Sequence, residues 1–298
     1  VISDEQEYSF NDIYKEYNNM TNWIEAERIK EGSVVAVLAE FTPISIALLL
    51  SLIEKNMIIV PISKTIKIID RYIEISESEY FIQIIDEKTT VIKTKNVASH
   101  DYIKKVKSNG NPGLILFSSG TTGEPKAAIH DLTHLVEKFK DSGKALRTIT
   151  FLLFDHIGGF NTMMHAIANG GTIATLKLRS PEEVCRLIEK YKIELLPTSP
   201  TFINMILLSK VYKNYDLSSL KIISYGTEPM PESALIKLHE ILPNVLLKQT
   251  YGLSEVGIMA TKSENSKSLW MKLGGKNFET KIEEDILYIR SNLAMIGY

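Results

Sequence analysis

The chain has 298 residues, of which 44% are hydrophobic and 23% charged, and its formal net charge is −2. These values are typical of a globular protein with one large or two ordinary domains. Because the net charge is small and the basic residues are scattered, the composition excludes an electrostatic basis for binding nucleic acid or a membrane surface.

The first part of the chain alternates between predicted strands and helices. Residues 33–39 and 57–63 are rich in β-branched side chains and predict buried strands. Between them, Pro43 can open a helix, and the apolar run at 44–53 is too short to span a bilayer, so it predicts a buried core helix. Shorter strands are expected at 79–86 and 89–95.

The same alternation continues to about residue 257. Residues 111–119 predict a strand, and 131–146 predict an amphipathic helix with Asp131 as its N-cap. Further strands are expected at 148–154, 171–178, 193–199 and 220–226. This alternation predicts an α/β fold with mainly parallel sheets. After Gly257 short strands and turns predict a small β-rich part, 257–298.

The single cysteine, Cys185, lies on the apolar face of a predicted helix at 180–191. No intrachain disulfide can form, and we expect a reducing, cytoplasmic location. We expect Cys185 to be a small core residue rather than a nucleophile. No role is predicted for His130, His134 or His165.

A polar loop follows the predicted strand at 111–119. Successive backbone N–H groups and hydroxyls in one turn form a concave surface that binds anions, above all phosphates, and glycine permits close approach. The residues concerned are Ser118, Ser119, Gly120, Thr121, Thr122, Gly123 and Lys126. A polar turn that only links a strand to a helix would not explain this ordered set.

A Walker-type phosphate loop is the first alternative for this segment. It requires G-x-x-x-x-G-K-[ST], in which the lysine and the hydroxyl carry the chemistry. Here Lys126 follows Pro125, and Ala127 stands where the magnesium-binding hydroxyl would be. The Walker interpretation therefore fails at both positions.

The ordered string S-S-G-T-T-G-x-P-K instead resembles the phosphate loop of the ANL superfamily of adenylate-forming enzymes. That superfamily includes acyl-CoA and aryl-CoA synthetases, adenylation domains of nonribosomal peptide synthetases, and beetle luciferases. Four later segments resemble its further motifs, in the same order along the chain: the acid-pocket segment 154–160, the adenine segment 224–235, the Y-G-x-[ST]-E segment 249–257 and the closing segment 285–298. The resemblance covers nearly the whole chain.

The resemblance implies a fold and a reaction. Residues 1–298 would form the N-terminal large AMP-binding domain, with two interleaved sheet-and-helix subdomains and a small β-rich one. The smaller C-terminal lid domain, with its catalytic lysine, would lie outside 1–298, so residues 1–298 alone are expected to be weakly active or inactive. The implied reaction uses ATP and Mg²⁺ to convert a small carboxylic acid into an acyl-adenylate, which is then transferred to CoA.

Two other functions stay open from the sequence. An adenylation domain of this kind can load the phosphopantetheine of a carrier protein instead of CoA. A non-catalytic nucleotide- or acyl-binding protein could share the same fold. In amino-acid-activating relatives an aspartate binds the substrate ammonium, and Asp155 lies one position too early for that role. An acyl or aryl acid is therefore favoured over an amino acid.

The resemblance also implies roles for individual residues. The hydroxyls at 118–122 would donate to the β- and γ-phosphates, and Lys126 would contact phosphate or fix the loop. Glu255 would bind magnesium, because carboxylate oxygen is a ligand that this ion prefers, and Ser254 would donate to the α-phosphate. The adenine ring would lie between the ring of Tyr251 and the backbone of Gly226, Thr227 and Glu228. Gly252 follows Tyr251 in the same motif. His156 would meet the carboxylate substrate, with Gly158 and Gly159 leaving room for its chain.

Overall fold

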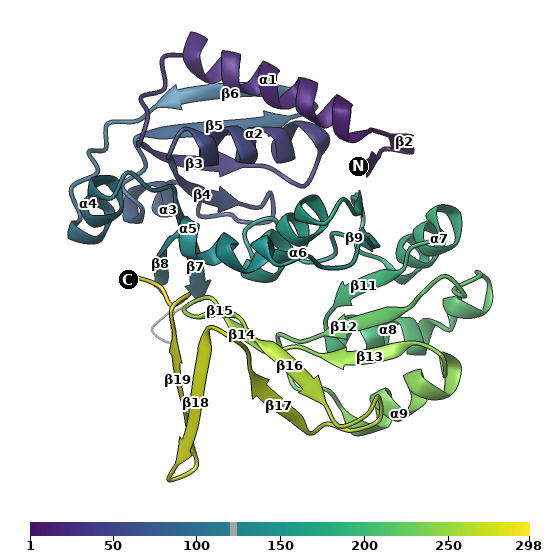
Figure 1. The fold of residues 1–298 in the computed structure, drawn as a ribbon. Coiled ribbons are helices and arrows are strands. Elements are labelled where there is room, and N and C mark those ends of the chain that lie inside the picture. The colour runs from purple at the N-terminus through teal and green to yellow at the C-terminus, as the bar shows by residue number, and fades with distance from the viewer. Residues whose placement is uncertain (120–123) are drawn as a thin grey trace.

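A computed structural model describes residues 1–119 and 124–298, except for the side chain of Ser119. The predictions for Gly120, Thr121, Thr122 and Gly123 therefore lie outside the described residues. The described chain forms two multistranded sheets with helices packed on their faces, and antiparallel hairpins extend from them at the C-terminal end (Figure 1). This is the predicted α/β architecture.

The first sheet has six strands in the order β6-β5-β3-β4-β7-β8. Its interior pairs are parallel, and β6 and β8 add antiparallel edges. The strands are β3 (Val34–Leu38), β4 (Ile58–Ile62), β5 (Tyr80–Ile85), β6 (Lys88–Lys93), β7 (Gly113–Ser119) and β8 (Pro125–Asp131). Every residue of β3 and β4 is buried, as expected for parallel strands covered on both faces.

Four helices belong to this half: α1 (Phe10–Ala26), α2 (Pro43–Glu54), α3 (Ile69–Ile75) and α4 (Asp101–Ser108). The predicted start of α2 is confirmed, because Pro43 is its first residue and the Thr42 hydroxyl caps it by accepting from the Ser45 N–H. The apolar run is a core helix, since Leu48 and Leu52 are fully buried.

The second sheet has seven strands in the order β13-β12-β11-β9-β10-β1-β2, all parallel except the β1–β2 pair. Its strands are β1 (Ile2–Ser3), β2 (Gln6–Glu7), β9 (Arg147–Ile149), β10 (Thr172–Ala174), β11 (Leu195–Thr198), β12 (Ile222–Tyr225) and β13 (Leu246–Gln249). Because β1 pairs with β10, the two halves are interleaved along the chain.

The remaining helices are α5 (Leu132–Glu137), η1 (Lys138–Lys140), α6 (Ile157–Ala168), α7 (Pro181–Tyr191), α8 (Pro200–Ser209), η2 (Val211–Lys213) and α9 (Glu232–Ile241). Helix α6 connects the two halves, since its Met163 shares a buried cluster with Leu114 of β7 in the first sheet and Ile173 of β10 in the second. Cys185 is 1% exposed, and burial raises the pKa of its thiol to about 12. A core role for Cys185 is thereby confirmed.

Three predicted elements are shorter than expected, and one strand was not predicted. The helix expected at 131–146 ends at Glu137, continues as the single turn η1, and leaves 141–146 without helical structure. The strand expected at 148–154 ends at Ile149, and the strand expected at 171–178 ends at Ala174. The segment after the polar loop is a strand, β8, which returns antiparallel to β7 and pairs Ser118 with Lys126.

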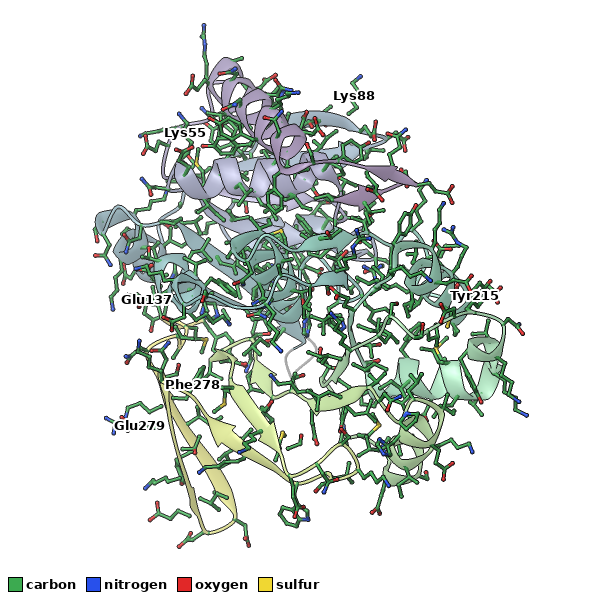
Figure 2. The ribbon with its side chains drawn as sticks, turned by 45° about the vertical axis from the view of Figure 1, so that its right-hand side comes forward. Lys55, Lys88, Glu137, Tyr215, Phe278 and Glu279 are labelled. Carbon is green, nitrogen blue, oxygen red and sulfur yellow. The ribbon has the colours of Figure 1, made fainter. Side chains whose placement is uncertain are left out.

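The β-rich part consists of three two-stranded antiparallel hairpins (Figure 1). They are β14 (Gly252–Leu253) with β15 (Gly257–Ile258), β16 (Ala260–Ser263) with β17 (Met271–Gly274), and β18 (Phe278–Glu283) with β19 (Ile286–Ser291). The first hairpin starts five residues earlier than predicted. Charged side chains such as Lys88 of β6 and Glu279 of β18 point outward (Figure 2).

In the described parts of the chain, no helix combines the length and apolar character needed to cross a membrane.

Candidate active site

The predicted nucleotide segments follow the carboxyl ends of strands. The phosphate loop begins at the end of β7, the adenine segment follows β12, and Thr250 and Tyr251 follow β13. Strands β12 and β13 are parallel neighbours, with Tyr225 opposite Gln249. Ligands of open α/β sheets bind at the carboxyl ends of the strands, so these segments lie where a ligand is expected.

Tyr298 joins the phosphate-loop strands to the Y-G-x-[ST]-E segment. Its hydroxyl donates a hydrogen bond to Oε1 of Glu255, and the Lys126 ammonium lies over its ring, 5.4 Å from the centroid. The bond to Glu255 raises the pKa of the Tyr298 hydroxyl, burial adds to this, and the Ser118 side chain opposes it. Ser118 and Lys126 of the predicted phosphate loop and Glu255 of the predicted magnesium site therefore lie around one side chain.

Ser254 and Glu255 occupy the turn of the short β14–β15 hairpin. Both of their carbonyls are held from outside the hairpin. The Ser254 carbonyl faces Nε2 of His130 at 2.6 Å, and the Glu255 carbonyl accepts from the Met295 N–H at 2.7 Å. The turn that carries the predicted magnesium ligand is thus fixed by two other segments.

His130 is a site residue for which the sequence suggested no role. It is 1% exposed on β8, and its Nδ1 has no partner within the described residues. Burial lowers its pKa, while the carbonyls of Ser254 and Leu293 and the charge of Glu255 act in the opposite direction. The ring is therefore neutral near pH 7, and the proton on Nε2 is donated to Ser254.

The end of the closing segment, after β19, runs beside β8. The Ile296 N–H donates to the Ile129 carbonyl at 2.7 Å, and the Ile129 N–H donates to the Gly297 carbonyl at 3.0 Å. These two bonds place Tyr298 beside Lys126 and explain how residues from the end of the chain reach the phosphate loop.

The adenine segment turns sharply after β12. A Cβ on Gly226 would lie 2.5 Å from Oγ1 of Thr250, so only glycine allows this approach. Thr227 has φ 73°, which is unusual and strained for a β-branched residue. The Glu228 carboxylate accepts from the Thr201 N–H at 2.8 Å, and this bond lowers the pKa of Glu228.

Tyr251 and Gly252 lie next to this turn, because the Thr250 N–H donates to the Tyr225 carbonyl at 2.7 Å. Gly252 also needs to be glycine, since a Cβ there would lie 2.9 Å from the Gly257 carbonyl. The structure therefore brings the two predicted adenine segments together. The contacts of individual residues with adenine stay predictions.

His156 lies at the start of α6, between the two sheets. Its Nδ1 accepts from the Gly158 N–H at 2.9 Å and so caps the helix. Burial lowers its pKa, opposed by the neighbouring charge of Asp155. Asp155 itself accepts from the Ser63 N–H at 3.0 Å, which connects this segment to the end of β4.

Gly158 and Gly159 are buried in the first turn of α6. A Cβ on Gly158 would lie 2.5 Å from Cδ1 of Leu152, and one on Gly159 would lie 2.0 Å from the Leu153 carbonyl oxygen. In the described structure the space left by both glycines is filled by the preceding segment. The substrate contact predicted for them stays a prediction.

The donor set fits a magnesium ion shared with phosphates. Among the described residues no three His, Cys, Asp or Glu side chains converge to enclose a metal. Magnesium is usually bound by one or two carboxylates together with substrate phosphates and water. Glu255, beside the start of the phosphate loop, offers one such carboxylate.

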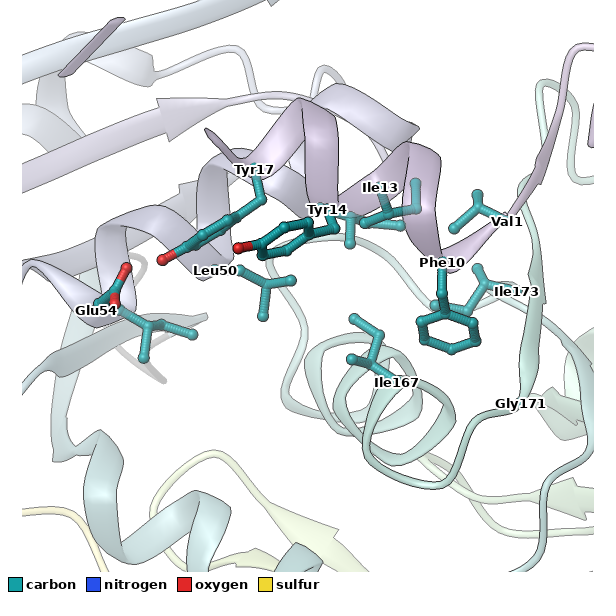
Figure 3. Close-up of a pocket in the computed structure, with 12 residues that line it drawn as sticks. Val1, Phe10, Ile13, Tyr14, Tyr17, Leu50, Glu54, Ile167, Gly171 and Ile173 are labelled. Carbon is teal, nitrogen blue, oxygen red and sulfur yellow. The ribbon is translucent and has the colours of Figure 1, made fainter. Parts of the chain in front are cut away.

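An apolar pocket of about 520 Å³ lies between α1, α2 and α6, away from these segments. Phe10, Tyr14 and Tyr17 of α1 lie on one side and Ile167 of α6 on another, with Glu54 at one end (Figure 3). This lining lacks the convergent donors that phosphates require, so the pocket is not a candidate nucleotide site.

The fold of this chain is that of the N-terminal part of several solved enzymes. The amide bond synthetase McbA from Marinactinospora thermotolerans shares the fold with a TM-score of 0.80, covering 100% of this chain and 69% of that chain at 19% identity. The N-terminal subdomain of Klebsiella oxytoca NpsA shares it with a TM-score of 0.78, covering 99% of this chain and 83% of that chain at 14% identity.

The chain belongs to the AMP-binding enzyme family, whose profile matches residues 1–283. It is 32% identical over 217 residues to 4-coumarate--CoA ligase-like 9 of Arabidopsis thaliana, a match that covers 64% of this chain and 38% of that protein. It is 33% identical over 159 residues to acyl-CoA synthetase 7 of Caenorhabditis elegans, a match that covers 47% of this chain and 29% of that protein. The chain thus spans less than half the length of these two relatives.

Proposed function

We propose that residues 1–298 form the nucleotide- and acid-binding part of an enzyme that activates a carboxylic acid with ATP. The carboxylate attacks the α-phosphorus of ATP, the bond to the β-phosphate oxygen breaks, and pyrophosphate leaves from an acyl-adenylate. The acyl group then passes to the thiol of CoA, and AMP is released.

The convergence of Ser118, Lys126 and Glu255 on Tyr298 is the observation that carries this proposal. Negative charge develops on the leaving pyrophosphate, and preorganised donors that face this charge stabilise the transition state. Ser118 and Lys126 supply a hydroxyl and a cation at the ends of the phosphate loop, with the donors of Thr121 and Thr122 between them in the sequence. Magnesium held by Glu255 would neutralise phosphate charge when bound.

The position of His156 supports the acid side of the reaction. Its Nδ1 is occupied by the Gly158 N–H, so the neutral ring carries its proton on Nε2. This N–H would orient the incoming carboxylate without adding a charge that competes with the α-phosphate. Its location between the two sheets brings the acid toward the nucleotide segments.

The names of the curated relatives favour CoA as the acceptor and an aryl or acyl acid as the substrate. Loading of a carrier-protein phosphopantetheine is the alternative acceptor reaction. Release of a CoA thioester, compared with transfer to a phosphopantetheinylated carrier, distinguishes the two.

Pyrophosphate exchange into ATP, measured on the complete protein with a panel of carboxylic acids, tests the proposed activation step. We expect acid-dependent exchange, and we expect Thr122→Ala to slow it by about one to three orders of magnitude, the scale for loss of a preorganised donor. Failure of every acid to support exchange would leave the non-catalytic binding alternative. An unchanged rate in Thr122→Ala would remove the loop from the mechanism.

A further inference from the structure

The segment before Tyr298 is held between a strand and a helix of the first half. The Ile296 N–H donates to the Ile129 carbonyl at 2.7 Å, and the Ile129 N–H donates to the Gly297 carbonyl at 3.0 Å. A Cβ on Gly297 would lie 2.2 Å from Cε2 of Tyr102, so the segment passes directly against α4. Strand β8 and helix α4 therefore fix the place from which the Tyr298 side chain extends.

The same segment holds both the backbone and the side chain of Glu255. The Met295 N–H donates to the Glu255 carbonyl at 2.7 Å, and the Tyr298 hydroxyl donates to Oε1 of the Glu255 carboxylate. A side chain held in this way has lost much of its rotamer freedom before a ligand arrives, so binding orders it less. Because Tyr298 occupies Oε1, the lone pairs of Oε2 are left to face a metal ion.

The ring of Tyr298 contacts a charge of the opposite sign. The Lys126 ammonium lies 5.4 Å from the ring centroid, where the negative face of the ring attracts it without neutralising it. Within the described residues no ion pair joins Lys126 to Glu255. A direct pair would occupy both groups, whereas the proposed chemistry needs the cation for phosphate and the carboxylate for magnesium.

We propose that Tyr298 is a positioning residue of the magnesium–nucleotide site. Its hydroxyl turns the Glu255 carboxylate toward the ion, and its ring keeps Lys126 close to that carboxylate but not paired with it. Tyr298 thus acts through these two residues rather than on the reacting atoms. The inference rests on the proposed function, in which Glu255 binds magnesium.

Metal binding without turnover tests the role of the hydroxyl. Mn²⁺ prefers the same oxygen ligands as Mg²⁺, and its electron paramagnetic resonance signal reports the bound fraction. The complete protein is titrated with Mn²⁺ at a fixed concentration of α,β-methylene-ATP, an analogue that cannot release pyrophosphate. Tyr298→Phe keeps the ring but loses the hydroxyl, so it should weaken Mn²⁺ binding by at least about tenfold, the scale for loss of a group that orients a metal ligand.

Tyr288→Phe is the matched control for the loss of a tyrosine hydroxyl. Tyr288 lies on β19, and the Lys281 ammonium lies over its ring, 5.1 Å from the centroid. The two tyrosines therefore share a lysine contact, but only Tyr298 bonds to the proposed magnesium ligand. Tyr288→Phe should leave Mn²⁺ binding unchanged, and neither variant should weaken binding of the analogue in the absence of metal.

A double-mutant cycle tests the role of the ring. Tyr298→Leu removes the ring as well as the hydroxyl, and Lys126 can then approach Glu255. Mn²⁺ binding should therefore weaken by about threefold more than in Tyr298→Phe, a coupling on the scale found between residues in contact. When Lys126→Met is also present, Tyr298→Leu and Tyr298→Phe should have equal effects, because no cation is left to pair with the carboxylate.

The outcomes separate this inference from the proposed function. Unchanged Mn²⁺ binding in Tyr298→Phe would overturn the inference, and acid-dependent pyrophosphate exchange would still retain the proposed function. Tighter binding would mean that the hydroxyl competes with the ion for the carboxylate, which also overturns the inference. An equal additional loss in Tyr298→Leu with and without Lys126 would assign that loss to packing and overturn the role of the ring.

The opposite combination is also informative. If no acid supports exchange while Tyr298→Phe still weakens Mn²⁺ binding, the proposed activation step is wrong and Tyr298 remains a positioning residue of a metal–nucleotide site. If the unmodified protein binds no Mn²⁺ in the presence of the analogue, the proposed function and this inference fall together.

Discussion

The β14–β15 and β18–β19 hairpins have the same topology but are stabilised differently. Strands β14 and β15 have two residues each, and the turn between them is held by His130, Met295 and Tyr298. Strands β18 and β19 have six residues each and are paired along their full length. Many of their side chains are exposed, including Ile282 at 76%.

The difference shows what the turn that carries the proposed magnesium ligand requires. A short isolated hairpin is marginally stable in water, so β14–β15 depends on contacts from distant segments. Those contacts fix the backbone carbonyls of Ser254 and Glu255. The proposed chemistry needs the side chains of both residues in a fixed position. The long hairpin is paired along its own length and packs against the core through Phe278 at its start. Its exposed side chains are therefore expected to tolerate change without effect on the site.

The largest effect is expected at the tip of the short hairpin. Glu255→Gln keeps the shape of the side chain but removes its charge, so the magnesium concentration needed for activity should rise and the exchange rate at fixed magnesium should fall by about two orders of magnitude. Magnesium titration of exchange measures this, and circular dichroism checks the fold. A variant with normal magnesium dependence and a lowered Tm would make Glu255 structural.

Removing the external support of the hairpin should have the next largest effect. His130→Leu leaves the Ser254 carbonyl without its donor, which should lower the free energy of unfolding by about 1–3 kcal/mol and slow exchange. His130→Gln, which keeps an N–H donor, should recover part of both losses. His134→Gln, an exposed histidine on the neighbouring α5, serves as the control. Equal behaviour of His130→Leu and His134→Gln would remove His130 from the site.

The same histidine gives the stability a pH dependence. Burial lowers the pKa of His130 below its ordinary value of 6.5, so below that pH the unfolded chain binds a proton that the folded chain does not. Stability should therefore be complete above about pH 6.5 and fall as the pH decreases. Urea unfolding from pH 7.5 to 5.5 should show a weaker decrease in His130→Leu than in the unmodified protein. Parallel pH profiles would contradict the assignment.

The smallest effect is expected in the long hairpin. Arg290 pairs with Glu279 at 2.9 Å, and both side chains are more than 70% exposed. Such surface pairs contribute little, so Arg290→Gln should change the free energy of unfolding by at most about 0.5 kcal/mol and leave exchange unchanged. A loss of exchange would mean that this hairpin takes part in the reaction.

Local patterns in the sequence predicted much of the fold. The apolar runs at 33–39 and 57–63 became β3 and β4, and the apolar run after Pro43 became α2, because burial on both sides leaves a continuous hydrophobic signal. The helix expected at 131–146 was too long because Gly143 packs against His165 and Asn169, with a hypothetical Cβ 2.9 Å from each. That contact is not visible in local periodicity.

The site was predictable as a set of motifs but not as an arrangement. Residues 118–126, 224–228 and 251–255 were identified from their order and chemistry. Strand β8 was missed because Pro125 and Lys126 read as a loop, and with it the burial of His130. The run Ala128-Ile129 before His130 was the available signal. No local pattern could show that Tyr298 reaches Glu255 across the β-rich part.

The bond between His130 and Ser254 also has a consequence for the order of folding. The two residues are 124 positions apart, and contacts between such distant positions form late because loop closure is costly. Strand β8 can pair with β7 early, but its histidine then lacks a partner until the second sheet and the closing segment are in place. During synthesis on the ribosome, the phosphate loop would therefore wait for most of the remaining chain before its surroundings are complete.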